Sequence, residues 1–143
     1  PLPECKRRRS FAFSQPQDFW DRAIKTFRTA KLVMDSDPDS SASRFYYSAF
    51  YAVSALFAID GKTFKKHSAV ETAVHRDLVK TGRWTAKLGD DYSFLRGARE
   101  TGDYGGILHV LEEEIESALQ AAVRILEAVH KENSKAFPLD WGK

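Results

Sequence analysis

Hydrophobic residues recur at helical intervals along most of the chain, and no segment shows the strict alternation of a β-strand. A capping-box spacing at Ser14 and Gln17 predicts a first helix over residues 16–35, with the apolar positions Phe19, Ala23, Phe27, Ala30 and Met34. The turn-forming sequence DSDPDSS at 35–41 then precedes an almost wholly apolar segment. That segment predicts a second and most buried helix, ending at Gly61.

A third helix is predicted over about residues 68–81, because Val70, Val74 and Leu78 share one face and Gly82 follows. The spacing of Leu88, Tyr92, Leu95 and Arg99 predicts a shorter fourth helix. Thr101 and Gly102 follow it and are expected to break the helix.

A long amphipathic helix is predicted from Gly106 to about residue 129, with Glu112, Glu113 and Glu114 near its positive N-terminal end. Short connections between long helices favour antiparallel neighbours. We therefore expect an all-α, antiparallel up-and-down bundle of four main helices plus a short fifth helix. The expected organisation is a basic N-terminal arm (1–15), a helical domain (16–133) and an irregular C-terminal tail (134–143) that docks on the body or on a partner.

The composition fits a single domain whose core needs no metal or disulfide, since 143 residues with 43% hydrophobic content can bury enough apolar surface. The single Cys5 excludes an internal disulfide, and the four histidines are not spaced as metal ligands. We therefore expect no metal and no cofactor. No apolar run is long enough to span a bilayer, so we expect no membrane partner and a cytoplasmic protein.

Charge is concentrated at the start of the chain, where Lys6, Arg7, Arg8 and Arg9 supply four of the 22 basic residues. The remainder is close to neutral, although the whole chain carries a net charge of +2. Such an arm either contacts nucleic-acid phosphates without sequence preference or is a solvated terminal segment.

The segment RFYYSAFYA (44–52) surrounds one arginine with aromatic residues and contains no acidic residue. Arg44, Tyr47 and Tyr51 are spaced to share one stripe of a helix. A guanidinium beside phenol rings can bind a phosphate while the rings stack on a base. Alternatively, Arg44 pairs with a carboxylate of a neighbouring helix.

Two further polar groups stand out. Lys66 and His67 lie at the start of the third predicted helix, where they could bind a phosphate or transfer a proton. Alternatively, Ser68 is an N-cap and the lysines beside it are solvated. Arg96, Arg99, Asp103 and Tyr104 surround the expected break at Gly102, which is either a functional corner or an ordinary turn. Asp103 is the natural candidate to pair with Arg44.

Four blocks in this order resemble the HEPN-domain family, over roughly residues 19–129: RFYYSAFY (44–51), KHS (66–68), LVKTG (78–82) and RETGDY (99–104). The closest branch is the small prokaryotic one that is often encoded beside a minimal nucleotidyltransferase. The resemblance implies a helical bundle that dimerises, a polar site between helices and no metal. It also implies a toxin of a toxin–antitoxin pair, acting as a ribonuclease, with the nucleotidyltransferase as antitoxin.

The sequence departs from the family pattern at two positions. Family ribonucleases carry a histidine four to six residues after the motif arginine, whereas Tyr104 stands at that place after Arg99. A phenol with a pKa near 10 is a poor base at neutral pH. Tyr51 also replaces a frequent histidine. His67 is then the remaining acid–base candidate in the matching blocks, because Arg124 and His130, which satisfy the spacing, point about 120° apart on one helix.

We therefore predict a pocket that binds RNA or a nucleotide. Arg99 and His67 are the candidate catalytic residues, and Arg44, Tyr47, Tyr51, Lys66, Asp103 and Tyr104 are the candidate substrate-binding residues. The rival hypothesis is a non-catalytic partner of a nucleotidyltransferase, with Tyr104 as a possible acceptor of a transferred nucleotide. In the simplest alternative, Arg44 and Asp103 form a purely structural pair.

Overall fold

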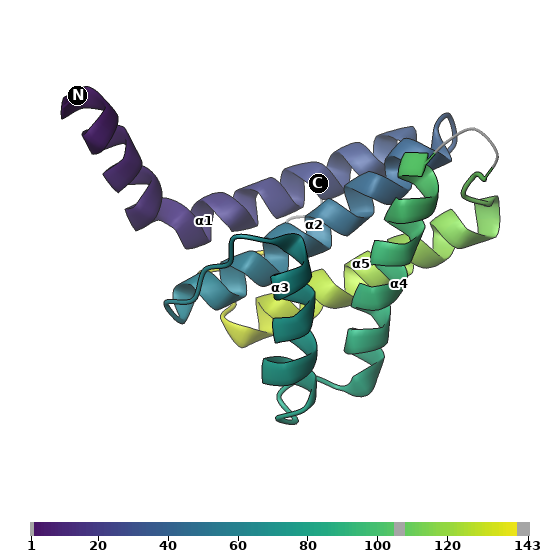
Figure 1. Cartoon of the computed structure of the whole chain (residues 1–143). Helices are drawn as coiled ribbons and strands as arrows, with labels where there is room; N and C mark the ends of the chain where they lie inside the picture. Colours follow the sequence, from purple (N-terminus) through teal and green to yellow (C-terminus); the bar gives the residue numbers. More distant parts are fainter. Residues whose placement is uncertain (1, 105–107, 140–143) are drawn as a thin grey trace.

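The computed structural model describes residues 2–104 and 108–139, with side chains from residue 15 onward, and over these ranges it contains helices and no strand. The elements are α1 (Leu2–Val33), α2 (Pro38–Ile59), α3 (His67–Ala73), the π-helical turn η1 (Val74–Val79), α4 (Ala86–Tyr104) and α5 (Glu112–Glu132) (Figure 1). Four long helices and the short α3 thus form an antiparallel bundle, as the hydrophobic pattern predicts.

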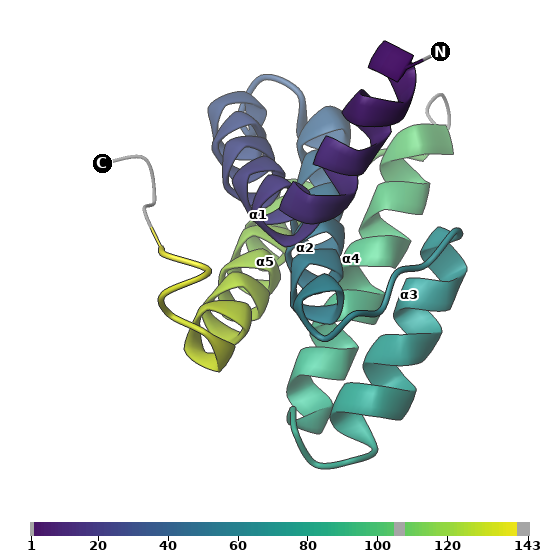
Figure 2. The same cartoon turned by 90° about the vertical axis from the view of Figure 1, so that its left-hand side faces the viewer.

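Helix α2 is the centre of the bundle, because it packs against α1, α4 and α5 (Figure 2). Its apolar side chains are fully buried on most of its circumference. Small hydroxyl residues allow close contact with α1: Ser41 Oγ donates to Ala30 O at 2.8 Å, and Ser48 Oγ donates to Ala23 O at 2.7 Å. The helix ends at Ile59, close to the predicted end, and is followed by Gly61, whose φ of 81° favours glycine.

Helix α1 begins much earlier than the sequence pattern predicts. Ser14 and Gln17 lie inside the helix rather than at its start, and Pro16 also lies within it. The preceding segment holds Glu4, Lys6 and three arginines, residue types that favour a helix, and the basic arm is helical. The ribbon of α1 bends in this region (Figure 1), as expected where a proline removes a backbone donor.

The expected break at Gly102 is wrong, because α4 continues through it to Tyr104. A Cβ atom at Gly102 would lie only 2.5 Å from the backbone oxygen of Asp39. The glycine is therefore required for close contact between α4 and the start of α2, and not for a turn. Close packing, which the local sequence cannot reveal, explains the error.

Two other boundaries differ from the prediction. The third helix is not uniform, since α3 gives way to the π-helical η1 before Gly82, whose φ is 85°. The last helix begins at Glu112 rather than at Gly106, although Glu112, Glu113 and Glu114 do occupy its first turn. The expected first apolar position, 107, lies outside the described residues.

The C-terminal segment docks on the body. Phe137 is fully buried, with its ring centroid 5.3 Å from that of Trp20. Trp20 Nε1 donates to Pro138 O at 2.8 Å, and His130 Nδ1 donates to Phe137 O at 2.7 Å. Of the two expected docking places, this segment uses the protein's own core, while Trp141 lies outside the described residues.

Candidate functional site

Arg99 on α4 lies against the aromatic surface of α2. Its guanidinium carbon is 5.4 Å from the ring centroid of Tyr46 and 5.4 Å from that of Tyr47, a geometry that favours cation–π attraction. One turn later on the same helix, Asp103 Oδ2 lies 3.0 Å from Arg99 Nε. The N–H is not aligned with the carboxylate for a hydrogen bond, so the contact is an ion pair. The arginine is thus held in place by two rings and one carboxylate.

Arg96 lies one turn before Arg99 and is paired with two carboxylates. Its Nε is 2.6 Å from Glu71 Oε1 on α3, and its Nη1 contacts Glu100. Ser93 also donates a hydrogen bond to Glu71, at 3.0 Å. These contacts tie α3 to α4 beside Arg99.

A cavity of about 460 Å³ opens next to these arginines, and we call it the Arg99 pocket. Its walls come from α2, α3 and α4, which meet here although they are far apart in the sequence. It is lined by Tyr46, His67, Ser68, Arg96, Arg99, Glu100, Asp103 and Tyr104.

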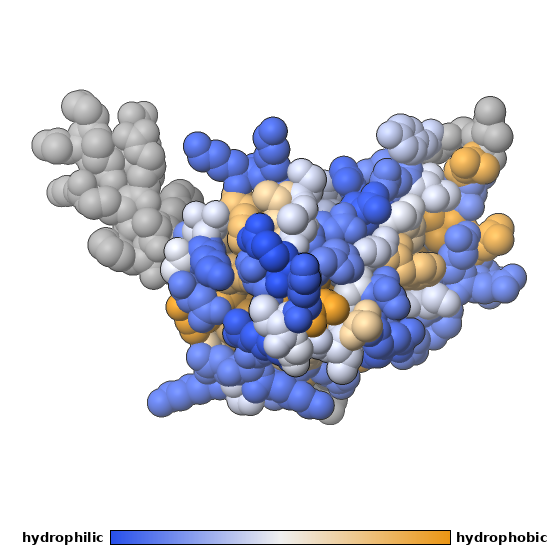
Figure 3. Space-filling model, turned by 60° about the horizontal axis from the view of Figure 1, so that its bottom comes forward, coloured by the Kyte–Doolittle hydropathy of each residue, from blue (hydrophilic) through white to orange (hydrophobic). Residues whose placement is uncertain are grey.

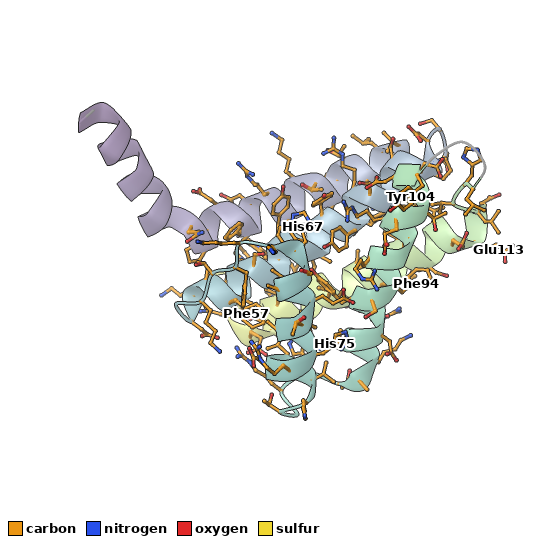
Figure 4. The ribbon with its side chains drawn as sticks, in the orientation of Figure 1. Phe57, His67, His75, Phe94, Tyr104 and Glu113 are labelled. Carbon is orange, nitrogen blue, oxygen red and sulfur yellow. The ribbon has the colours of Figure 1, made fainter. Side chains whose placement is uncertain are left out.

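His67 is the first residue of α3 and reaches into this pocket (Figure 4). Its ring centroid is 4.4 Å from that of Phe50 and 5.4 Å from that of Tyr47. Partial burial, followed by the positive charge of Arg99, lowers the pKa of His67 below its usual 6.5. The imidazole is therefore neutral at pH 7 and can accept a proton.

Two buried tyrosines have a different role: Tyr46, which lines the pocket, and Tyr92, which does not. Burial raises the pKa of Tyr46, and burial raises that of Tyr92 still further. The two ring centroids lie 5.9 Å apart in the core. Both phenols therefore remain neutral and serve as packing surfaces rather than as bases.

The structure brings together four of the predicted site residues. His67, Arg99, Asp103 and Tyr104 line the same pocket, and the Tyr47 ring contacts both Arg99 and His67. Tyr104 lies at the rim with 79% of its surface exposed (Figure 4).

The expected pair between Arg44 and Asp103 is wrong, since Asp103 pairs with Arg99. The two partners are one turn apart on α4, so their side chains are neighbours without any interhelical reach. Arg44 is instead exposed and forms no ion pair within the described part of the chain. A buried structural pair is therefore not its role.

Two other predicted residues do not line the Arg99 pocket. Tyr51 faces α1, where its ring centroid is 6.4 Å from that of Phe19 and 5.8 Å from the guanidinium carbon of Arg22. Lys66 is exposed and occupies the N-cap position of α3, so Ser68 is not the N-cap. The helical spacing correctly predicted that Tyr51 lies on the same face of α2 as Tyr47. However, α1 covers the part of this face that carries Tyr51.

A second, smaller cavity of about 390 Å³ adjoins the first, and we call it the Arg44 pocket. Asp103 lies in the wall of both cavities. The Arg44 pocket is lined by Asp39, Ser40, Ser43, Arg44, Tyr47, Gly102 and Asp103. Asp39 accepts a hydrogen bond from His109 Nδ1 at 2.8 Å, a contact between residues so distant in sequence that no pattern indicated it.

The candidate site predicted from the sequence did not include Arg96 or Glu71. Arg96 was singled out beside Gly102 but was given no role, although its position three residues before Arg99 places both on one helical face. Glu71 had no such signal, since only the packing of α3 on α4 brings it to Arg96.

A cavity of about 590 Å³, larger than the Arg99 pocket, lies elsewhere, between the start of α4 and the end of α5. Its arginines have structural partners: Arg83 pairs with Glu132, and Arg124 binds the buried Asp91 through two hydrogen bonds. Arg124 is thus engaged with Asp91 and His130 with Phe137 O, and neither of them lines the Arg99 pocket. The cavity offers neither a histidine nor stacked rings, so the Arg99 pocket is the stronger candidate.

Other features of the described chain limit the possibilities. It contains no group of three side chains placed to bind a metal ion. None of its helices combines the length and the apolar character required to cross a bilayer.

Much of the surface in Figure 3 is hydrophilic. Hydrophobic residues lie on the side of the connection between α4 and α5, where Leu108 and Leu111 are 64% and 60% exposed.

The bundle and the sequence together define the class of protein. A family model described as HEPN domain matches residues 16–133, and the chain belongs to this family. A UPF0332 protein of Thermotoga maritima is 37% identical over 116 residues, covering 80% of this chain and 88% of the relative. A Methanocaldococcus jannaschii protein named "Putative toxin MJ0142" is 30% identical over 100 residues, covering 69% of this chain and 68% of the relative.

A third relative, a UPF0332 protein of Gloeobacter violaceus, is 26% identical over 115 residues, which are 79% of this chain and 91% of that protein. No solved structure matches the chain significantly.

Proposed function

We propose that this HEPN protein binds RNA or a nucleotide in the Arg99 pocket and acts as the toxin of a toxin–antitoxin pair. The observation that carries the proposal is the position of the Arg99 guanidinium, against two adjacent tyrosine rings and in the same pocket as the neutral imidazole of His67. A guanidinium binds phosphate through paired hydrogen bonds, and aromatic rings offer stacking surfaces for bases.

Binding would be a competition between anions. In the free protein Arg99 is paired with Asp103, and Arg96 is paired with Glu71 and Glu100. An RNA phosphate would replace Asp103 at Arg99, so the affinity should fall as the salt concentration rises. Removing the competing charge with Asp103→Asn should strengthen binding.

The same groups can support cleavage without a cofactor. His67 would accept the proton of a ribose 2′-hydroxyl, whose oxygen then attacks the adjacent phosphorus. The bond from phosphorus to the 5′-oxygen breaks, and the Tyr104 phenol at the rim would donate a proton to that leaving oxygen. The products are a 2′,3′-cyclic phosphate and a 5′-hydroxyl. Arg99 would stabilise the charge that develops on the phosphate oxygens.

The biological setting is part of the proposal. The relative named as a putative toxin supports a toxin role, and the resemblance to the branch encoded beside a minimal nucleotidyltransferase supports that enzyme as antitoxin. The family resemblance also supports a homodimer.

The first experiment incubates the wild type and Arg99→Ala with total cellular RNA in EDTA and reads cleavage on a gel. His67→Ala tests the base, and Lys80→Ala, an exposed cation outside the lining of either pocket, is the control. Cleavage by the wild type and by Lys80→Ala alone would support the proposed mechanism. Equal cleavage by His67→Ala would contradict the role of the imidazole.

A parallel binding assay separates recognition from cleavage. A fluorescent RNA oligonucleotide should bind Arg99→Ala about tenfold or more weakly than the wild type, because a hydrogen-bonded charge contact is lost. An unchanged affinity would refute the Arg99 pocket as the binding site.

The exposure of Tyr104 favours a second candidate function, that of a non-catalytic partner of a nucleotidyltransferase. Its phenol is 79% exposed at the end of α4, where a partner enzyme can reach it. Co-expression with an adjacent nucleotidyltransferase, followed by mass spectrometry, should then show a nucleotide-sized increase that Tyr104→Phe abolishes. An unmodified wild-type protein would argue against this function.

A further inference from the structure

Half-buried aromatic side chains form a continuous strip beside the Arg99 pocket, and we call it the aromatic strip. It consists of Phe19 on α1 and of Tyr47, Phe50 and Tyr51 on α2. The ring centroids of Tyr47 and Tyr51 are 6.2 Å apart, and that of Phe19 follows at 6.4 Å from Tyr51. Helices α1 and α2 lie side by side (Figure 1), which brings Phe19 to the end of the strip. The strip therefore runs from the Arg99 pocket towards α1.

The strip carries the same arginine–tyrosine pair twice. The guanidinium carbon of Arg99 lies 5.4 Å from the ring centroid of Tyr47, and that of Arg22 lies 5.8 Å from the ring centroid of Tyr51. The two tyrosines are one turn apart on α2, or about 6 Å along the helix axis, a distance that neighbouring bases of an extended strand can span. A guanidinium that binds phosphate and a ring that stacks on a base are the two contacts that one nucleotide offers. The two pairs are thus placed for consecutive nucleotides.

The second pair is open to a ligand. Arg22 is exposed and has no ion-pair partner among the described residues. Helix α1 covers one side of Tyr51, but the ring is only half-buried. The phenol oxygens of Tyr47 and Tyr51 make no hydrogen bond to the described part of the chain, and neither belongs to its buried unpaired groups. The polar edge of each ring therefore faces solvent, where a base can reach it.

We infer a second nucleotide subsite, formed by Arg22 and by the rings of Tyr51 and Phe19, which binds the nucleotide next to the one in the Arg99 pocket. This subsite rests on the proposed function and deepens it, because it makes a single RNA strand with accessible bases, rather than a free nucleotide, the preferred ligand. Arg22 would contact the phosphate while the base stacks on the exposed part of Tyr51.

The test measures by fluorescence anisotropy how much more tightly the protein binds a labelled tetranucleotide than a labelled mononucleotide, and we call this ratio the length gain. Both ligands carry 2′-fluoro riboses, which lack the hydroxyl that the proposed cleavage needs. We expect Tyr51→Leu and Arg22→Ala each to reduce the length gain about fivefold, because one stacked base or one phosphate contact is lost. Arg99→Ala should instead weaken the binding of both ligands.

Two matched variants and one matched ligand serve as controls. Tyr51→Phe retains the ring and should retain the length gain. Lys25→Ala removes an exposed cation of α1 outside the aromatic strip and should alter the gain only by the general effect of its charge. An abasic tetranucleotide keeps the length and the charge of the strand, so its binding should not respond to Tyr51→Leu.

The possible failures are distinguishable. A wild-type length gain in Tyr51→Leu or in Arg22→Ala would overturn the subsite and leave the Arg99 pocket intact. An equal loss for both ligands would also overturn it, because the residue would then act through the fold or the first pocket. If the wild type binds neither ligand, the proposed function fails together with the subsite. Arg22 is exposed, so its variant keeps the test valid if Tyr51→Leu disturbs the packing of α1 on α2.

Discussion

Two glycines of α4 should respond in opposite ways to the same substitution. Gly97 has open space where a Cβ atom would lie, whereas a Cβ atom at Gly102 would lie 2.5 Å from the backbone oxygen of Asp39 and 3.2 Å from its carbonyl carbon. Alanine is favoured over glycine in a helix interior by about 0.8–1 kcal/mol. Gly97→Ala should therefore increase the free energy of unfolding by up to that amount.

Gly102→Ala should lower the free energy of unfolding instead. Restoring an ordinary contact requires α4 and α2 to separate by about 1 Å, and no flexible side chain can give way because the obstacle is backbone. Overpacking of this kind costs about 1–3 kcal/mol, which exceeds the helix-propensity gain near the end of α4. The two variants should then differ by about 2–4 kcal/mol.

Urea unfolding of the two variants and the wild type measures this difference, and thermal unfolding provides a check, with about 3–4 °C in Tm per kcal/mol for a chain of this size. The two substitutions add the same methyl group to the same helix, so each serves as the control for the other. Equal stability of the two variants would refute the close contact between α4 and the start of α2. It would also remove the support on which Asp39 and His109 are placed.

Three further predictions concern stability. Arg124→Ala should cost about 2–3 kcal/mol in urea unfolding, because it leaves the buried Asp91 without its two hydrogen bonds; a loss under about 0.5 kcal/mol would contradict this. Phe137→Ala should cost about 3 kcal/mol and the half-exposed Phe94→Ala far less, and a similar small loss for both would show that the C-terminal segment does not dock. The lowered pKa of His67 means that the folded state binds fewer protons there than the unfolded chain, so stability should fall as the pH drops below about 6.5. His67→Gln should flatten that slope in unfolding titrations between about pH 7 and pH 5, and an unchanged slope would place the effect at another group.

The spacing of hydrophobic residues was sufficient to predict the helices that have one clearly apolar face. The core positions of α2 follow from the sequence, as does its end shortly before Gly61. The predicted helix boundaries were wrong where one residue type fits two kinds of structure. A glycine can mark a turn, but Gly102 permits close packing inside α4. A proline can mark the start of a helix, but Pro16 lies inside α1. The role of a single glycine or proline depends on how closely the neighbouring helix packs against it.

The candidate site was also predicted only in part from the sequence. The motif order indicated that Arg99, Asp103 and Tyr104 belong with His67, and the structure brings them to one pocket. The expected partner of Asp103 was wrong because the intrahelical neighbour Arg99 was available at one turn's distance. The role of these residues in binding or cleavage stays a prediction.

The sequence by itself determined the helical class, the central place of α2 and the family, because hydrophobic period and motif order are carried by residues close together along the chain. Only the tertiary structure decided which rings contact Arg99 and which carboxylate pairs with Arg96 across helices, since those contacts join helices that are well separated along the chain. The Asp39–His109 contact depends on the same packing. Ion pairing and burial are set by distance in space, which the linear order of the residues does not specify.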